Sequence, residues 1–487
     1  MRLGQPSTVY DHRRMDSQTQ ISDAESQPLK VGWLRLLTGI VCVLPFCVQA
    51  CFFNGGFYYD DAFHLEQCRM IDEGTIDLAD YVLLAHGEHL IPVWKLMFCA
   101  CWFLFGENSA GFHFVVTAFH VGSALLLLAI LRRYTTDLCA AVASVLWAGA
   151  AIGGWDGPFL WIAASHLSIG STFFLGAMFC VARFGDRQDE DGEIWSAAMA
   201  VCLMLSLLTM GSLIVLTPAL LLQFWLLERT GRESRAVLFR WGICFVVPCL
   251  LVAVAHLVCV LPAMQKLDRP ATDIYSGIQM LGGGYAAASW KLFLPTGNAV
   301  MWGRLLGFAL IAWLLFKTTA VTRNVCLIFF VLSFCFSLLA YMARSSWEVS
   351  HVLMWGRYRY LPTLFWCVVS AAVIERGITW MFVHRRGLLP AVLTAASIVF
   401  VMSQCRIAWE ASPVFRQISA EEKQAKVPEP GTQAAVFHTD VMESYEIQTG
   451  RFGRADDAFG RHLLRGRGFN DLSSHREGSR AKCGSVG

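Results

Sequence analysis

The sequence predicts an all-α polytopic membrane protein, and two observations support that prediction. First, 55% of the 487 residues are hydrophobic and only 16% are charged, with a mean hydropathy of +0.49. Soluble domains carry charge on roughly a quarter of their residues, so a soluble fold would have too few polar side chains for its surface. Second, apolar runs long enough to cross a bilayer as helices recur along the chain.

The apolar runs give the expected order of the crossings. A short run at 90–105 follows the first of them. The polar first 30 residues lack the apolar core and cleavage site of a signal peptide, so residues 31–53 are expected to form an uncleaved first crossing. The predicted crossings are 33–53, 111–131, 138–153, 166–183, 195–210, 212–228, 241–261, 303–320, 324–342, 360–383 and 388–404.

Lys and Arg predict the orientation, because short cytoplasmic loops are enriched in both. The N-terminal tail, 1–32, is placed in the cytoplasm by Arg13, Arg14 and Lys30, whereas the loop 54–90 has eight acids against one base and should lie outside. If 90–105 is a juxtamembrane helix on the outer surface, the loop at Arg132-Arg133 turns inward, as the rule requires. We therefore predict about eleven crossings, with twelve or thirteen as alternatives.

This topology predicts a transmembrane domain over 33–404, with a long first outer loop, and a polar tail over 405–487 that is partly disordered. Four segments are expected on the outer face: 54–105, 154–165, 262–302 and 343–360. The first and third are long, and long loops in compact folds are usually functional or disordered. The functional residues are therefore expected on the outer face.

Two adjacent carboxylates, Asp60 and Asp61, follow the first crossing. Charge at a bilayer boundary is costly, so it usually marks topology or chemistry. In an extended or irregular loop the two side chains diverge. One can then act as a general base or ligate a divalent cation while the other makes local hydrogen bonds. The pair is equally typical of an acidic loop that caps a helix.

A second polar group, His86, Glu88 and His89, precedes Pro92, which suits the first turn of a helix. No fourth zinc ligand has recognisable spacing. We interpret the group as polar lining of a cleft and predict no dedicated metal site, although the acids leave a divalent cation open as a cofactor. Lys95 either reaches toward a phosphate at the interface or anchors the helix.

A third group contains Arg357 and Arg359. Pro362 disfavours a helical conformation just before it and favours a helix that starts there. In an extended run the two arginines project to one side, and their guanidinium groups suit a lipid phosphate. The alternative is an aromatic belt with arginines that reach the interface.

Four other polar residues lie in or near the predicted crossings. Asp156 and His351 lie in outer segments and are candidates for lining the same cleft, although Asp156 also suits a helix end. His120 and His256 lie inside predicted crossings, and we interpret both as hydrogen-bonded core histidines. No nucleic-acid partner is predicted, because the formal net charge is only +2 and no basic stripe with interleaved aromatics is present.

Taken together, these residues resemble the GT-C superfamily of integral-membrane glycosyltransferases, which use polyprenyl-phosphate sugars. That family has an acidic motif after the first crossing, here Asp60-Asp61, and a juxtamembrane helix ending in a Leu-Phe-Gly-like turn, here 104–106. A late Arg-Tyr-x-x-Pro-like element corresponds to 359–362. The family's Ser-Lys-Glu-like element appears only as the uncharged 209–212. The tail is too short for the large soluble domain of oligosaccharyltransferases, so the likeness is to smaller bacterial members.

The resemblance implies an inverting glycosyltransferase of the bacterial inner membrane with an outward-facing active site. Asp60, assisted by Asp61, would take the acceptor proton, and Arg357, Arg359 and Lys95 would bind the donor phosphate. The implied partners are a polyprenyl-phosphate sugar, a lipid or glycan acceptor and membrane lipids. The alternatives are a polyprenyl-linked glycan ligase, and a lipid or glycan flippase or transporter. Few carboxylates lie in the predicted crossings, which disfavours an ion-coupled transporter.

Overall fold

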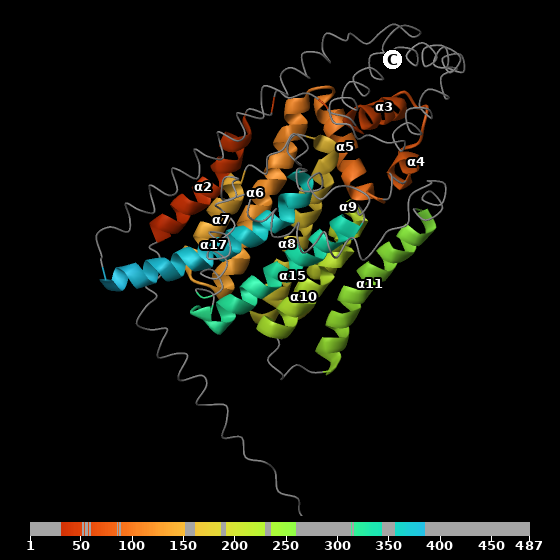
Figure 1. Cartoon of the computed structure of the whole chain (residues 1–487). Helices are drawn as coiled ribbons and strands as arrows, with labels where there is room; N and C mark the ends of the chain where they lie inside the picture. The colour runs from red at the N-terminus through yellow and green to blue at the C-terminus, as the bar shows by residue number, and fades with distance from the viewer. Residues whose placement is uncertain are drawn as a thin grey trace, which may run out of the picture. The chain divides into compact units, whose positions relative to one another are not determined.

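The computed structural model describes the chain in segments. All of the described residues fall in one of two compact units, which comprises Met1–Gln265 and Arg269–Phe415. Within them the structure is helical apart from an isolated bridge between His86 and His89 (Figure 1). The described residues are 31–50, 53, 57, 60–84, 86, 89–150, 161–186, 191–228, 235–259, 313, 316–342 and 356–384.

Six helical segments of the described part are long and apolar enough to cross a membrane, which supports a multi-pass membrane protein. Their apolar stretches are Ser109–Tyr134, Ile162–Phe184, Gly192–Thr209, Gly211–Glu228, Leu238–Cys259 and Ala320–Ala340. The helices that make up all or most of five of these stretches are α6 (Ser109–Tyr134), α8 (His166–Asp186), α9 (Asp191–Thr209), α11 (Arg235–Cys259) and α15 (Ala320–Met342). Each coincides with a predicted crossing.

Three further predicted crossings are helical: α2 (Val31–Gln49), α7 (Asp137–Gly149) and α17 (Gly356–His384). The run 388–404 and most of 303–320 lie outside the described residues, so the total of eleven stays a prediction. The core forms where α8 packs against α6 and α9, and where α17 packs against α7 and α15 (Figure 1).

The predicted juxtamembrane run forms α5 (Pro92–Phe105), whose 14 residues span about 21 Å. This length is short of the roughly 30 Å hydrocarbon core. The helix ends at Gly106, whose φ of +57° favours glycine. Asn108 then caps α6, because its side chain accepts a hydrogen bond from the Ala110 N–H at 3.2 Å. The predicted Leu-Phe-Gly turn is thus the connection between α5 and α6.

The run predicted as a single crossing over 212–228 is not one regular helix. A 3₁₀ segment, η3 (Gly211–Leu216), leads into α10 (Thr217–Gln223), which continues as a π-helix, η4 (Phe224–Glu228). Hydrogen bonds in a π-helix join residues five apart, and such segments are rare. Nothing in the apolar pattern distinguishes them from an α-helix.

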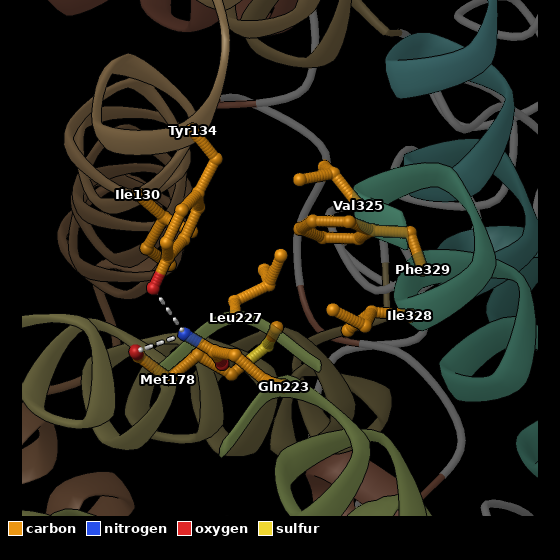
Figure 2. Close-up of a pocket in the computed structure, with 8 residues that line it drawn as sticks. All are labelled: Ile130, Tyr134, Met178, Gln223, Leu227, Val325, Ile328 and Phe329. Atoms are coloured by element: carbon orange, nitrogen blue, oxygen red, sulfur yellow. Dashed lines mark hydrogen bonds between the residues drawn. The ribbon is translucent and has the colours of Figure 1, made fainter. Parts of the chain in front are cut away.

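A pocket lies beside this segment, between α6, α10 and α15 (Figure 2). Its polar wall is a short chain of hydrogen bonds, in which Gln223 Nε2 donates to the Tyr134 hydroxyl at 3.2 Å and to the Met178 carbonyl at 2.9 Å. The rest of the lining is apolar: Ile130, Leu227, Val325, Ile328 and Phe329.

Candidate functional site

The acid pair begins a helix, α3 (Asp60–Asp72), and does not lie in the irregular loop that we expected. Carboxylates suit the first turn of a helix, because the N–H groups and the positive end of the helix dipole are there. Asp61, His64 and Cys68, spaced three and four residues apart, are all fully buried. They define one inward face of α3, which fixes the helix against its neighbours.

Asp61 ties α3 to the segment before α8. Its Oδ1 accepts a hydrogen bond from the Ala163 N–H at 2.6 Å, and Ala163 belongs to the 3₁₀ turn η2 (Ile162–Ser165), which leads directly into α8. A buried carboxylate requires such partners, because it has left water. The position of the acid pair is therefore set by a contact 102 residues away in sequence.

One turn after the acid pair, His64 occupies an aromatic cage. Its Nδ1 is 2.8 Å from the hydroxyl of Tyr81, on α4 (Leu78–Leu83). The rings of Trp94 and His86 lie 4.7 and 4.8 Å away between centroids. Burial above all, and then neighbouring histidines and a lysine, holds the pKa of His64 well below its ordinary value. The ring is neutral at pH 7, and its Nε2 has no hydrogen-bond partner among the described residues.

The predicted lining residues His86 and His89 lie on the two sides of a tight turn. Their backbone groups pair at 2.8 and 3.0 Å. The ring of His86 faces His64, and the ring of His89 lies 6.0 Å from that of His166, the first residue of α8. The turn therefore joins α3 to the start of α8. Glu88 lies outside the described residues.

Lys95 lies inside the protein, in the first turn of α5. Its side chain is fully buried, and the ammonium donates to the carbonyls of Tyr81 at 2.8 Å and Leu84 at 2.5 Å. Those carbonyls end α4, where a cation is favoured. Burial lowers the pKa of Lys95 to about 8. Contact with a lipid phosphate would require the ammonium to leave both carbonyls.

The arginine motif is helical, which corrects the extended run that we expected before Pro362. Helix α17 begins at Gly356, so Pro362 lies inside it. Positions 357 and 359 are then about 200° apart around the helix and do not share a side. The local preference of the proline is overridden by Tyr360, which is fully buried and fixes the first turn against other helices.

Tyr360 is the centre of a buried polar network. Its hydroxyl lies 3.1 Å from His120 Nδ1 on α6 and 3.0 Å from Ser168 Oγ on α8. His120 Nε2 is also 3.0 Å from the Trp147 carbonyl on α7. This confirms the interpretation of His120 as a hydrogen-bonded core histidine. The network holds the start of α17 to three other helices.

The acid pair and the arginine motif are therefore both fastened to the start of α8. Ala163, which bonds Asp61, and Ser168, which contacts Tyr360, are five residues apart. With a rise of about 1.5 Å per residue in an α-helix and about 2.0 Å in a 3₁₀-helix, Ala163 and Ser168 are about 8–10 Å apart along the helix axis. Asp60 immediately precedes Asp61, and Arg359 immediately precedes Tyr360.

The remaining predicted site residues, Asp156 and His351, lie outside the described residues. Within the described ranges, no group of three or more His, Cys, Asp or Glu side chains is arranged to hold a metal ion. Sequence reasoning missed His64 as a site residue. Its spacing from the acid pair and from Cys68 was the available signal, because it places all of them on one face of a helix.

No protein-family model matches the chain, and no curated protein matches it. Two solved structures are similar at 12% identity, and each alignment covers 80% of this chain and 56% of the other. One is the oligosaccharyltransferase AglB from Archaeoglobus fulgidus in complex with an inhibitory peptide and a dolichol-phosphate, with a TM-score of 0.42. The other is the Archaeoglobus fulgidus oligosaccharyltransferase in the apo form, with a TM-score of 0.39.

Proposed function

We propose that the chain is a membrane glycosyltransferase of the GT-C type, which moves a sugar from a polyprenyl-phosphate donor to a lipid or glycan acceptor. The observation that carries the proposal is the shared attachment of Asp61 and Tyr360 to the six-residue stretch 163–168, which ends η2 and begins α8. It supports a site in which an acid pair and two arginines belong to one end of the helical bundle. A base and a phosphate-binding cation are the two parts that such a transfer needs.

Asp60 is the proposed base. It takes the proton of the acceptor hydroxyl, whose oxygen attacks the anomeric carbon on the face opposite the phosphate. The bond from that carbon to the phosphate oxygen breaks, so the configuration inverts and polyprenyl phosphate leaves. Arg357 and Arg359 stabilise the charge that develops on the phosphate. Asp61 positions Asp60, since its hydrogen bond to Ala163 holds the first turn of α3.

Lys95 has a different part in this proposal from the one expected from the sequence. Its two bonds to carbonyls at the end of α4 make it a positioning residue that holds the loop around His64. The distribution of Lys and Arg supports an active site on the outer face of a bacterial inner membrane. A divalent cation at the acid pair remains compatible with the proposal, which does not require one.

The test is transfer from a labelled polyprenyl-phosphate sugar in membranes that contain the variant protein. Asp60→Asn should reduce transfer by about 10²–10⁴-fold, the contribution typical of a general base. Arg359→Gln should reduce it as well, and Arg359→Lys should restore only part, because lysine lacks the planar fork. Asp72→Asn is the matched control, because Asp72 is an exposed acid at the other end of the same helix. Full transfer by Asp60→Asn would reject the assignment.

A further inference from the structure

Two buried cysteines meet between α3 and α5. Cys68 Sγ and Cys99 Sγ are 3.1 Å apart, and the two thiols share a hydrogen bond. Both side chains are buried, with 0% and 3% of their surface exposed. Cys68 follows His64 by one turn and Cys99 follows Lys95 by one turn, so the pair lies in the interface that holds the candidate site.

The separation of the two sulfur atoms is close to what a covalent bond needs. A disulfide has a sulfur–sulfur distance of about 2.05 Å, so a closure of about 1 Å would join them. The two helices are already held together nearby, because Arg69 of α3 forms an ion pair at 2.9 Å with Glu107, just beyond α5. Little rearrangement of the backbone is therefore required.

The compartment decides whether such a pair is oxidised. Disulfides persist in the periplasm and outside cells, whereas cytosolic thiols are kept reduced. The distribution of Lys and Arg predicts that the acidic loop containing α3 lies outside. The inference rests on that part of the proposed function. We propose that Cys68 and Cys99 form a disulfide that closes the first outer loop beneath the acid pair.

The bond forms by exchange with a disulfide oxidant, either a protein or a small molecule. One of the two cysteines attacks the oxidant as a thiolate. It forms a mixed disulfide with one sulfur of the oxidant and releases the other as a thiol. The second cysteine then loses its proton and attacks the sulfur of the first, and the oxidant leaves as a dithiol. Two electrons and two protons pass to the oxidant.

The burial of both thiols sets the order of events. In the folded protein an oxidant cannot reach them, so the bond forms before α5 packs against α3 and is afterwards shielded from reductants. Two further buried or half-buried cysteines provide a comparison, because the thiols of Cys180 on α8 and Cys202 on α9 also share a hydrogen bond. Both belong to apolar membrane-crossing stretches, where no oxidant reaches them, and we expect this pair to stay reduced.

Thiol trapping followed by peptide mapping tests the inference on the full chain. Membranes are quenched in acid, unfolded in detergent, alkylated with N-ethylmaleimide and digested for mass spectrometry. The expected result is one cross-linked peptide pair joining Cys68 to Cys99, which separates on reduction, while Cys180 and Cys202 carry the alkyl group. Cys101→Ala is the matched control and should keep the link, although Cys101 is buried two residues from Cys99.

Alkylation of both Cys68 and Cys99 would overturn the inference, and so would a link to Cys101. A reporter fusion after residue 133 then shows whether the shared orientation has also failed, since that loop should be cytoplasmic. Peptide mapping measures the disulfide, and the transfer assay measures the activity, so the two proposals are tested independently. Loss of transfer in Asp60→Asn with both thiols alkylated rejects the disulfide alone, whereas a cross-link with full transfer in Asp60→Asn rejects the catalytic assignment alone.

Discussion

The two ends of helix α6 bury polar groups in different ways. At its C-terminal end the carboxylate of Glu228, with 1% of its side chain exposed, accepts from Arg133 Nη2 at 3.0 Å and Nε at 3.3 Å, and from the hydroxyl of Tyr134. At the N-terminal end, Asp61 accepts from a backbone N–H, and His64 is held by a phenol and aromatic rings. At the C-terminal end the buried carboxylate is neutralised by an ion pair. At the N-terminal end the buried carboxylate and the histidine have only neutral polar or aromatic partners among the contacts described.

This difference suggests that the buried polar groups at the C-terminal end have a structural role, whereas those at the N-terminal end belong to the functional site. A carboxylate bound in two places by a guanidinium is committed to that partner, and its role is to hold η4 against α6. His64, which is neutral and whose Nε2 has no hydrogen-bond partner in the described part of the chain, is not committed in this way. Perturbed groups of this second kind cluster at functional sites, which is why we place the site at the N-terminal end of α6.

The largest effect is expected at the ion-paired end. Arg133→Met leaves the buried Glu228 carboxylate without its guanidinium, and breaking a buried pair in this way typically costs about 3–5 kcal/mol. Unfolding in detergent measures the loss. Arg132→Met is the matched control, because its 2.8 Å pair with Asp137 is exposed, and exposed pairs contribute about 0–1 kcal/mol. Equal losses in the two variants would remove the contrast between the two ends.

An intermediate effect is expected where α17 begins. Tyr360→Phe removes the hydroxyl that contacts His120 and Ser168, and stranding buried polar groups costs about 1–3 kcal/mol. It should also reduce transfer, because Arg357 and Arg359 lie in the turn that Tyr360 holds. Ser168→Ala provides a double-mutant cycle with Tyr360→Phe. Strictly additive losses of stability would show that the hydroxyl does not couple α8 to α17.

The smallest effect is the response of His64 to pH. The folded ring stays neutral below pH 6.5 because its pKa is held well below that value, whereas the unfolded ring takes up a proton. The unfolded state then binds more protons, so the free energy of unfolding falls as the pH drops from 6.5 toward the folded pKa. The contribution is at most about 1.4 kcal/mol per pH unit.

His64→Gln isolates this contribution, because glutamine can still pair with the Tyr81 hydroxyl but does not titrate. The variant should lose less stability between pH 7 and pH 5 than the wild type. The measurement is the unfolding midpoint in detergent across that range. Identical slopes for the two proteins would contradict a neutral His64 in the folded state.

The sequence was sufficient for features that depend on local pattern. Long apolar runs predicted α6, α8, α9 and α11, because a membrane crossing needs both length and apolarity. The shortness of 90–105 likewise predicted α5 as a helix too short to cross. Local rules failed where a distant contact decided the outcome. Pro362 predicted an extended run before it, but the burial of Tyr360 extends α17 to Gly356.

In the candidate site, too, local pattern identified some features and distant contacts decided the others. The acid pair was recognisable because charge is rare in so apolar a chain, and its helical conformation depends on the partner of Asp61, which is 102 residues away. The role of His64 depends on Tyr81 and Trp94, which the sequence alone does not bring together. Lys95 was ambiguous for the same reason, since nothing local shows that two carbonyls of another helix surround its ammonium.

The π-helix η4 has a consequence for how this chain tolerates insertions and deletions. A π-turn contains more residues than an α-turn, so deleting one residue between Phe224 and Glu228 would restore regular α-helical geometry. Because the wider turn absorbs its extra residue, Glu228 would stay nearly in register after this deletion and keep its direction toward Arg133. The π-helix is therefore a place where the chain could lose one residue and retain its buried ion pair.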